Sequence, residues 1–130
     1  MEDYQELVFV YGTLRQGASN HWRIQDAECL GTGLVRGGLY VIDWYPGLVL
    51  DPSGSRVAGE VYRVSPDLLE ELDAFEGAAG TPGSEYHRVR TDVTSPDGER
   101  REHVWVWEFR MPVEESRRIV SGDWIDREQL

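Results

Sequence analysis

The stretch "LVFVYGTLRQG", residues 7–17, joins five consecutive apolar residues directly to Gly-Thr-Leu-Arg. An unbroken apolar run of this length predicts a central strand that is covered on both faces. The strand ends abruptly at Gly12 and Thr13, where a turn can point successive backbone N–H groups at one place. Such a turn suits a carboxylate or a developing oxyanion, but the same residues also form plain strand-to-loop turns. From the residues alone, both interpretations of this loop stay open.

Short strand-like runs dominate the rest of the chain. They cover 33–42, 47–51, 57–64, 86–93 and 103–109. Gly37 and Gly38 predict a bend or bulge in the first of them, and "SPDG" at 95–98 predicts a hairpin turn before the last. Because strands and helices do not alternate strictly, the pattern predicts an α+β fold: a small mixed, mostly antiparallel β-barrel with a few flanking helices.

One helix is clear in the stretch "SPDLLEELDAFEG", residues 65–77. Ser65 is a favourable N-cap, and Pro66 suits the first helical position. The helix carries an apolar stripe at helical spacing, formed by Leu68, Leu69, Leu72 and Phe75. Gly77 supplies a stop signal. Weaker helical patterns cover 19–30 and 112–120.

The length of 130 residues fits a single domain spanning 1–130. The net charge of −11 argues against nucleic acid and against anionic membranes as partners, since both need a basic patch. All basic side chains are arginine, which excludes Schiff-base chemistry on a lysine. The acidic, polar start and the lack of any apolar run of ~20 residues predict a soluble, cytoplasmic protein. The sequence leaves the oligomeric state open.

Metal ligation finds little support in the sequence. The single cysteine, Cys29, cannot form a disulfide within the chain, and we expect it to be a small buried residue. His21, His87 and His103 lack the spacing of metal ligands, although the last two lie on neighbouring predicted strands and could meet. We therefore predict no metal site.

Two glutamates are candidates for proton transfer. Glu76 lies at the C-terminal end of the predicted helix, where the dipole disfavours a negative charge, and Phe75 beside it suggests an apolar setting. Both effects raise a carboxyl pKa toward the range that suits an acid/base, although most glutamates at helix ends are simply solvated. Glu60, in the strand "GEVY", is the next candidate, and for it we favour a structural role.

Arg88 is a candidate for substrate binding. Alternation along the strand places it on the same face as Tyr86 and Arg90. Near a pocket, its guanidinium could hold an anionic group bidentately. An ion pair with one of the 24 acidic side chains is an equally good interpretation.

Six motifs follow one another over nearly the whole chain. They are "VFVYGTLRQGASNH" (8–21), "YPGLV" (45–49), "VAGEVY" (57–62), "LDAFEG" (72–77), "YHRVRTDV" (86–93) and "SGDW" (121–124). Together they resemble the gamma-glutamylcyclotransferase superfamily, in its small AIG2-like, BtrG-like branch. The combination of "FVYGTL", "LDxxEG" and "YxR" is far more specific than any one motif.

The resemblance implies a pocket in which Tyr11, Gly12, Thr13 and Leu14 hold the glutamyl part of a small gamma-glutamyl substrate. Glu76 matches the glutamate of "LDxxEG" and is thereby implied to be the acid/base. In the implied reaction the substrate's own alpha-amine attacks its side-chain carbonyl, which releases 5-oxoproline and an amine. Because the nucleophile belongs to the substrate, neither a metal nor a cofactor is needed.

Two other functions remain open on the sequence. The fold can serve as a ligand-binding or interaction module without turnover. A related amide-cleaving enzyme with water as the nucleophile would release glutamate instead of 5-oxoproline. The leaving amine would meet loops such as 77–85, whose small residues do not identify it.

Overall fold

The computed structural model describes residues 5–76 and 85–125. The elements run in chain order as β1 (Glu6–Val10), η1 (His21–Arg23), β2 (Glu28–Val41), β3 (Pro46–Leu50), β4 (Ser55–Val64), α1 (Pro66–Glu76), β5 (Tyr86–Thr94), β6 (Arg100–Phe109) and η2 (Glu115–Arg117). Here η denotes a short 3-10 helix. None of the described helices is long and apolar enough to cross a membrane.

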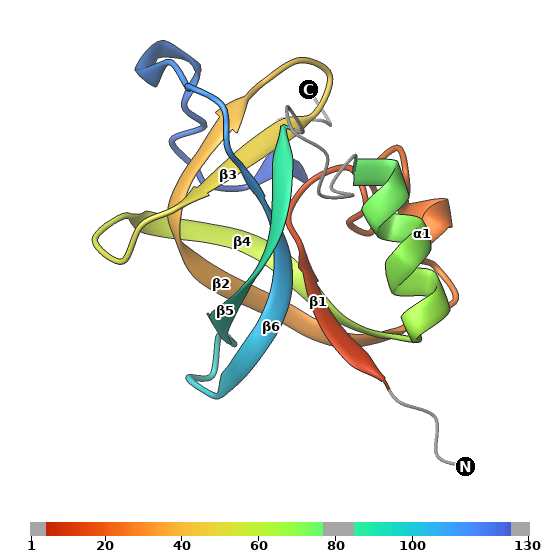
Figure 1. Ribbon diagram of the computed structural model, residues 1–130. Helices are drawn as coiled ribbons and strands as arrows, with labels where there is room; N and C mark the ends of the chain where they lie inside the picture. Colours follow the sequence, from red (N-terminus) through yellow and green to blue (C-terminus); the bar gives the residue numbers. More distant parts are fainter. Residues whose placement is uncertain (1–4, 77–84, 126–130) are drawn as a thin grey trace.

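The strands form one closed, mostly antiparallel sheet. Their order is β3-β2-β4-β1-β6-β5, and a further pairing of Leu34 in β2 with Thr94 in β5 closes the last five into a barrel. The pairing of β1 with β6, at Val8 and Trp105, is parallel. β3 lies outside this ring and pairs with β2 (Figure 1). The predicted α+β fold, a small mixed β-barrel, is confirmed.

β2 changes its partner at Gly37. This residue lies opposite both Ser55 of β4 and Leu50 of β3. A Cβ atom at Gly37 would lie 2.3 Å from the carbonyl oxygen of Val49, so only glycine lets the two strands approach so closely. The bulge expected at Gly37 and Gly38 is instead found between Cys29 and Gly31, where β2 and β4 shift register.

Two apolar clusters result from the alternation of side chains along the strands. One fills the barrel and includes Phe9, Leu48, Val61 and Val106. The other lies between the barrel wall and α1, which contributes its buried Leu69 and Leu72. Figure 1 shows α1 packed against the outside of the barrel, on the side of β1.

The predicted helix at 65–77 is confirmed over Pro66–Glu76. Ser65 caps it, since the Leu68 N–H donates to the Ser65 hydroxyl at 3.2 Å. The predicted stop at Gly77 lies outside the described residues.

The helix expected at 19–30 is wrong. This stretch holds only the 3-10 turn η1 and the start of β2, because Ile24 is its one fully buried side chain and offers no apolar stripe. The helix expected at 112–120 shortens to η2. Cys29, the second residue of β2, is exposed rather than buried.

Candidate active site

A cavity of about 250 Å³ lies where the tip of β1, the start of β3 and the end of α1 meet. It is lined by Phe9, Val10, Tyr11, Gly12, Thr13, Leu14, Trp44, Tyr45, Pro46, Phe75, Glu76, Glu85, Tyr86 and Trp107. The cavity therefore unites the loop after the first strand with the glutamate at the end of the helix, two features that lie far apart in the sequence.

The loop after β1 needs a glycine because it passes very close to β3. A Cβ atom at Gly12 would lie 2.7 Å from Cγ and 2.9 Å from Cδ of Pro46. Gly12 is not among the described glycines with positive φ, so the reason is close approach and not the unusual backbone conformation that the sequence suggested. Within the described residues, the N–H groups of Gly12, Thr13 and Leu14 donate no hydrogen bond to another residue.

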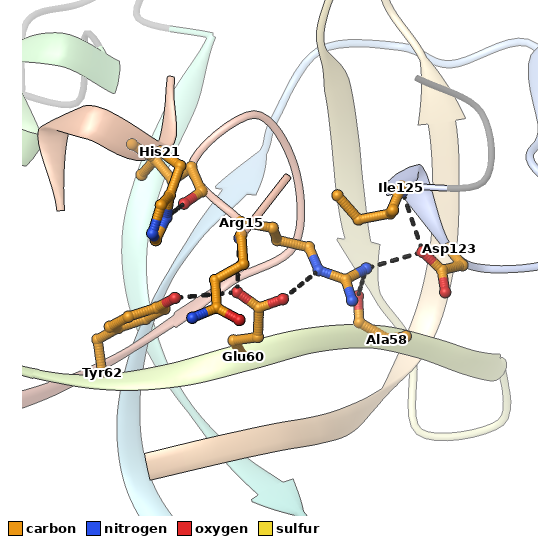
Figure 2. A network of polar contacts seen from close by, with 9 residues as sticks. Arg15, His21, Ala58, Glu60, Tyr62, Asp123 and Ile125 are labelled. Atoms are coloured by element: carbon orange, nitrogen blue, oxygen red, sulfur yellow. Dashed lines mark hydrogen bonds and ion pairs between the residues drawn. The ribbon is translucent and has the colours of Figure 1, made fainter. Parts of the chain in front are cut away.

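Arg15 fastens the far end of this loop to the barrel, as Figure 2 shows. Its Nε donates to Glu60 at 3.1 Å, and its Nη1 donates to Asp123 at 2.8 Å and to the Ala58 carbonyl at 3.4 Å. The Arg15 and Glu60 side chains are each only 8 % exposed, so this ion pair is shielded from solvent. A shielded, multiply bonded guanidinium fixes the loop far more firmly than a surface ion pair would.

Glu60 is fully engaged in this network. Its second carboxylate oxygen accepts the Gln16 N–H at 3.0 Å and the Tyr62 hydroxyl at 3.1 Å (Figure 2). Glu60 does not line the cavity. These contacts match the structural role that the sequence favoured for Glu60.

The Tyr11 hydroxyl is also engaged away from the cavity. It donates to the Trp107 carbonyl at 2.7 Å and accepts the Leu48 N–H at 3.2 Å. Burial, followed by the nearby charge of Glu76, raises the pKa of Tyr11 well above its ordinary value. Tyr11 therefore shapes the cavity wall and ties three strands together, and its phenol is a poor acid/base.

Glu76 is a partly buried carboxyl in the cavity wall. Burial, followed by the negative charge of Asp73, raises the pKa of Glu76 from 4.5 to about 7. A carboxyl with such a pKa exchanges protons readily near neutral pH, as a general acid/base requires. The sequence argument, from the helix end and from an apolar setting beside Phe75, gave the same direction for the Glu76 pKa, and burial is the larger cause in the structure.

Arg88 does not line the cavity. Its Nη1 lies 3.4 Å from Oδ2 of Asp73, and its guanidinium lies over the Trp105 ring at 4.2 Å. Arg88 thus forms an ion pair with an acidic side chain, which was its alternative interpretation. The other five candidate residues line the same cavity: Tyr11, Gly12, Thr13, Leu14 and Glu76.

His87 and His103 do not face each other. His87 of β5 lies opposite Glu108 of β6. His103 lies in β6 between Arg101 and Val104, where the two strands shift register. No group of three or more potential ligand residues gathers anywhere in 5–76 or 85–125.

Several cavity residues escaped the sequence analysis. Trp44, Tyr45 and Glu85 lie in connections whose meeting point depends on β3 folding back beside β2. The motif "YPGLV" was the one available signal for this side of the cavity. Tyr86 entered the sequence analysis as part of the "YxR" motif and as a neighbour of Arg88, without a role of its own. In the structure its hydroxyl donates to the Pro46 carbonyl at 2.6 Å and holds the wall in place.

Residues 8–126 match the family described as "Gamma-glutamyl cyclotransferase, AIG2-like". The chain belongs to this family. It is 38 % identical over 124 residues to the gamma-glutamylcyclotransferase family protein YtfP of Escherichia coli. This alignment covers 94 % of this chain and 98 % of that protein. It is 36 % identical over 96 residues to the gamma-L-glutamyl-butirosin B gamma-glutamyl cyclotransferase of Niallia circulans, covering 70 % and 60 % of the two chains.

A solved structure shares the fold of this gamma-glutamyl cyclotransferase, AIG2-like chain. Uncharacterized protein PH0828 from Pyrococcus horikoshii superposes with a TM-score of 0.71 at 28 % identity, covering 95 % of this chain and 93 % of that one. The family match contains every described residue of the cavity wall.

Proposed function

We propose that the chain is a gamma-glutamyl cyclotransferase that releases 5-oxoproline and an amine from a small gamma-glutamyl amine or peptide. The observation that carries the proposal is the cavity shared by Glu76 and the Gly12–Leu14 loop. The family membership supports the same type of reaction.

The proposed reaction needs one acid/base and one set of hydrogen-bond donors. Glu76, with its pKa raised to about 7, takes a proton from the substrate's alpha-ammonium. The freed amine attacks the side-chain carbonyl, a new C–N bond closes the five-membered ring, and negative charge develops on the carbonyl oxygen. Glu76 returns this proton to the leaving nitrogen as the original C–N bond breaks. The ring nitrogen still carries one proton too many, and the ionised Glu76 takes it and passes it to the released amine, so no water is consumed.

The loop N–H groups provide the donors for this scheme. Those of Gly12, Thr13 and Leu14 have no partner among the described residues, so they are available to the substrate carboxylate or to the developing oxyanion. Arg15 keeps the loop in place through Glu60 and therefore acts at a distance from the substrate. Holding the substrate amine next to its own carbonyl supplies a large part of the rate, because the attack is intramolecular.

The test is the release of 5-oxoproline from a panel of gamma-glutamyl amines by the parent and by Glu76→Gln. We expect Glu76→Gln to lose about 10²–10⁴-fold or more in turnover, because the amide cannot carry the proton. Glu71→Gln is the matched control, since Glu71 is an exposed residue of the same helix. Retention of more than about a tenth of the turnover in Glu76→Gln would exclude Glu76 as the acid/base.

The products separate the alternatives. Release of glutamate in place of 5-oxoproline would show that water is the nucleophile. Binding of the panel without any product would favour a ligand-binding module.

A further inference from the structure

A second cavity, of about 700 Å³, lies where β2 and β5 meet the turns at 51–54 and 95–99. Among the described residues, none lines both this cavity and the candidate active site. Figure 1 shows both turns on the opposite side of the barrel from α1, the helix that carries Glu76. The second cavity is therefore separate from the site already described.

Two arginines lie side by side in the wall of this second cavity. Arg36 of β2 and Arg56 of β4 are direct cross-strand partners. Their neighbours Val35 and Val57 are buried in the barrel, so alternation directs both guanidinium groups to the outer face, where both residues are exposed. Like charges at directly opposite positions destabilise a sheet. An anion bound between Arg36 and Arg56, the arginine pair, would relieve this repulsion.

The described part of the chain provides no carboxylate for the arginine pair. Eight of its twelve arginines form ion pairs, but Arg36 and Arg56 do not. Arg36 donates to the Gly54 carbonyl at 3.4 Å, and the Arg56 guanidinium has no hydrogen-bond partner among the described residues. In a chain with 24 acidic and 13 basic side chains, two adjacent cations without a carboxylate are an exception. They are free to bind an external anion.

Two aspartates also line the second cavity, but other groups occupy their oxygens. Asp92 forms an ion pair with Arg100, a third arginine of the wall. Asp51 accepts the N–H and the hydroxyl of Ser53 at 3.0 and 2.9 Å. Neither aspartate forms an ion pair with the arginine pair. Because arginines outnumber aspartates in this wall, the local potential favours anions, in contrast to the net charge of the chain.

The arginine pair suits a phosphate better than a carboxylate. A planar carboxylate matches one guanidinium fork, whereas a tetrahedral phosphate dianion has oxygens for two forks at once. The wall also contains the hydroxyl groups of Thr91 and Thr94 and the apolar side chains of Leu34, Leu50 and Pro52. The cavity volume lies in the usual range for a small-molecule site, so there is room for an organic part beside the phosphate.

We propose that the arginine pair binds the phosphate group of a small phosphorylated compound, whose organic part lies along Leu34 and Leu50. This site is additional to the cyclotransferase activity proposed above and does not depend on it. A nucleic acid or an anionic membrane is a poor fit, because two arginines form too small a basic patch on a chain of net charge −11.

Calorimetric titration of the whole chain at pH 8 with phenyl phosphate, inorganic phosphate and benzoate tests this inference. We expect phenyl phosphate to bind most tightly. Inorganic phosphate should bind several-fold more weakly because it lacks the apolar part, and benzoate at least about tenfold more weakly because it fills a single fork. The affinity should fall as salt is added, since the arginine pair is exposed. Absence of phenyl phosphate binding, or equal affinity for benzoate, would overturn the proposal.

Variants assign the binding to the arginine pair. Arg36→Gln and Arg56→Gln should each weaken phenyl phosphate binding about tenfold or more, because each removes charge-assisted hydrogen bonds. Arg63→Gln is the matched control: Arg63 is an exposed arginine of β4 that is already paired with Glu28 at 2.7 Å, so its loss should leave the affinity unchanged. An equal loss of affinity in all three variants would mean that only the overall charge matters and would refute the site.

Thermal unfolding checks that the variants fold. Without ligand, Arg56→Gln should be at least as stable as the parent, because the repulsion with Arg36 is relieved. Phenyl phosphate should raise the unfolding temperature of the parent and not that of Arg56→Gln. The same rise in both proteins would contradict the assignment.

A lipid headgroup carries the same phosphate chemistry as a soluble compound, and vesicles separate the two sources. We expect the chain not to sediment with phosphatidylcholine vesicles that contain phosphatidic acid. Sedimentation that Arg36→Gln and Arg56→Gln abolish would assign the arginine pair to a membrane surface and overturn the proposal of a soluble ligand.

Discussion

Asp73 lies one helical turn before Glu76 and is held from two sides. Arg88 Nη1 lies 3.4 Å from its Oδ2, and the Trp107 indole N–H donates to its Oδ1 at 2.8 Å. Burial first, and then the negative charge of Asp73, raises the pKa of Glu76. The Arg88 guanidinium forms an ion pair with Asp73 and so opposes part of that negative charge. The proton affinity of the proposed acid/base therefore depends on an ion pair that lies outside the cavity.

Asp73→Asn and Arg88→Ala should shift the pH profile in opposite directions. Loss of the Asp73 charge lowers the Glu76 pKa, so the acidic limb of kcat/KM should move down by about 0.5–1 pH unit. Loss of Arg88 leaves Asp73 unbalanced and should move the limb up by a similar amount. The measurement is kcat/KM for 5-oxoproline release across pH 5–9.

The Arg88 variant also tests the earlier interpretation of that residue as a substrate ligand. A selective rise in KM, with an unshifted pH profile, would favour direct substrate binding. Equal shifts in the same direction for both variants would contradict the ion-pair account.

Glu76→Gln should stabilise the protein at high pH and not at low pH. The folded-state pKa of about 7 exceeds the ordinary value of 4.5, so the ionised carboxylate is disfavoured in the folded protein. The parent therefore keeps its full stability below pH 4.5 and loses part of it as the pH rises through 7. Above that pH, Glu76→Gln should be more stable by about 1–3 kcal/mol, a value reduced for partial solvent exposure.

Urea unfolding at pH 5 and pH 8 measures this difference. The control is Glu71→Gln, whose exposed side chain should give nearly the same small change at both pH values. An equal gain for Glu76→Gln at pH 5 and pH 8 would show that its pKa is not raised.

Gly12→Ala should destabilise the loop through contact with β3. The new Cβ would overlap the Pro46 ring, with Cγ at 2.7 Å, and such overpacking costs about 1–3 kcal/mol. Pro46→Ala removes the atoms in conflict and keeps the carbonyl that accepts the Tyr86 hydroxyl. The double variant should therefore recover part of the loss, which a double-mutant cycle from thermal unfolding measures. Additive effects would mean that the two sites do not collide.

Glu60→Gln should impair folding before it impairs chemistry. It leaves Asp123, which is partly exposed, as the remaining charged partner of the buried Arg15 guanidinium, and breaking one side of a buried ion pair costs up to about 3–5 kcal/mol. We expect a lower unfolding temperature with turnover largely preserved in the folded fraction. Unchanged stability with lost turnover would return Glu60 to the list of catalytic candidates.

The sequence predicted the individual helices and strands better than the contacts between residues that lie far apart in the chain. Ser65 and Pro66 located the start of α1, and the apolar run at 7–11 located β1, because caps and unbroken hydrophobic runs are local signals. The stretch 19–30 was misjudged because its end pairs with Arg63 and Tyr62 of β4, a contact between distant residues. No local pattern shows such pairing.

The site divides in the same way. The Gly12 loop and Glu76 each carried a signal, one as a strand-end turn and the other as a helix-end carboxyl. Trp44 had none, and Glu85 was included only as the last residue of the stretch 77–85, because each becomes part of the wall only when β3 lies beside β2 and the chain returns at β5. The need for glycine at position 12 could be suspected from sequence, but its cause, the ring of Pro46, required the structure.

The attachment of the first strand to late parts of the chain has a consequence for biosynthesis. Val8 pairs in parallel with Trp105, and Arg15 donates to Asp123. On a ribosome, β1 emerges before every other described element, whereas Trp105 and Asp123 emerge only after β2, β3, β4, α1 and β5. A nascent chain halted before β6 would expose the apolar β1 with one side unpaired, and it would need protection from aggregation until β6 has emerged.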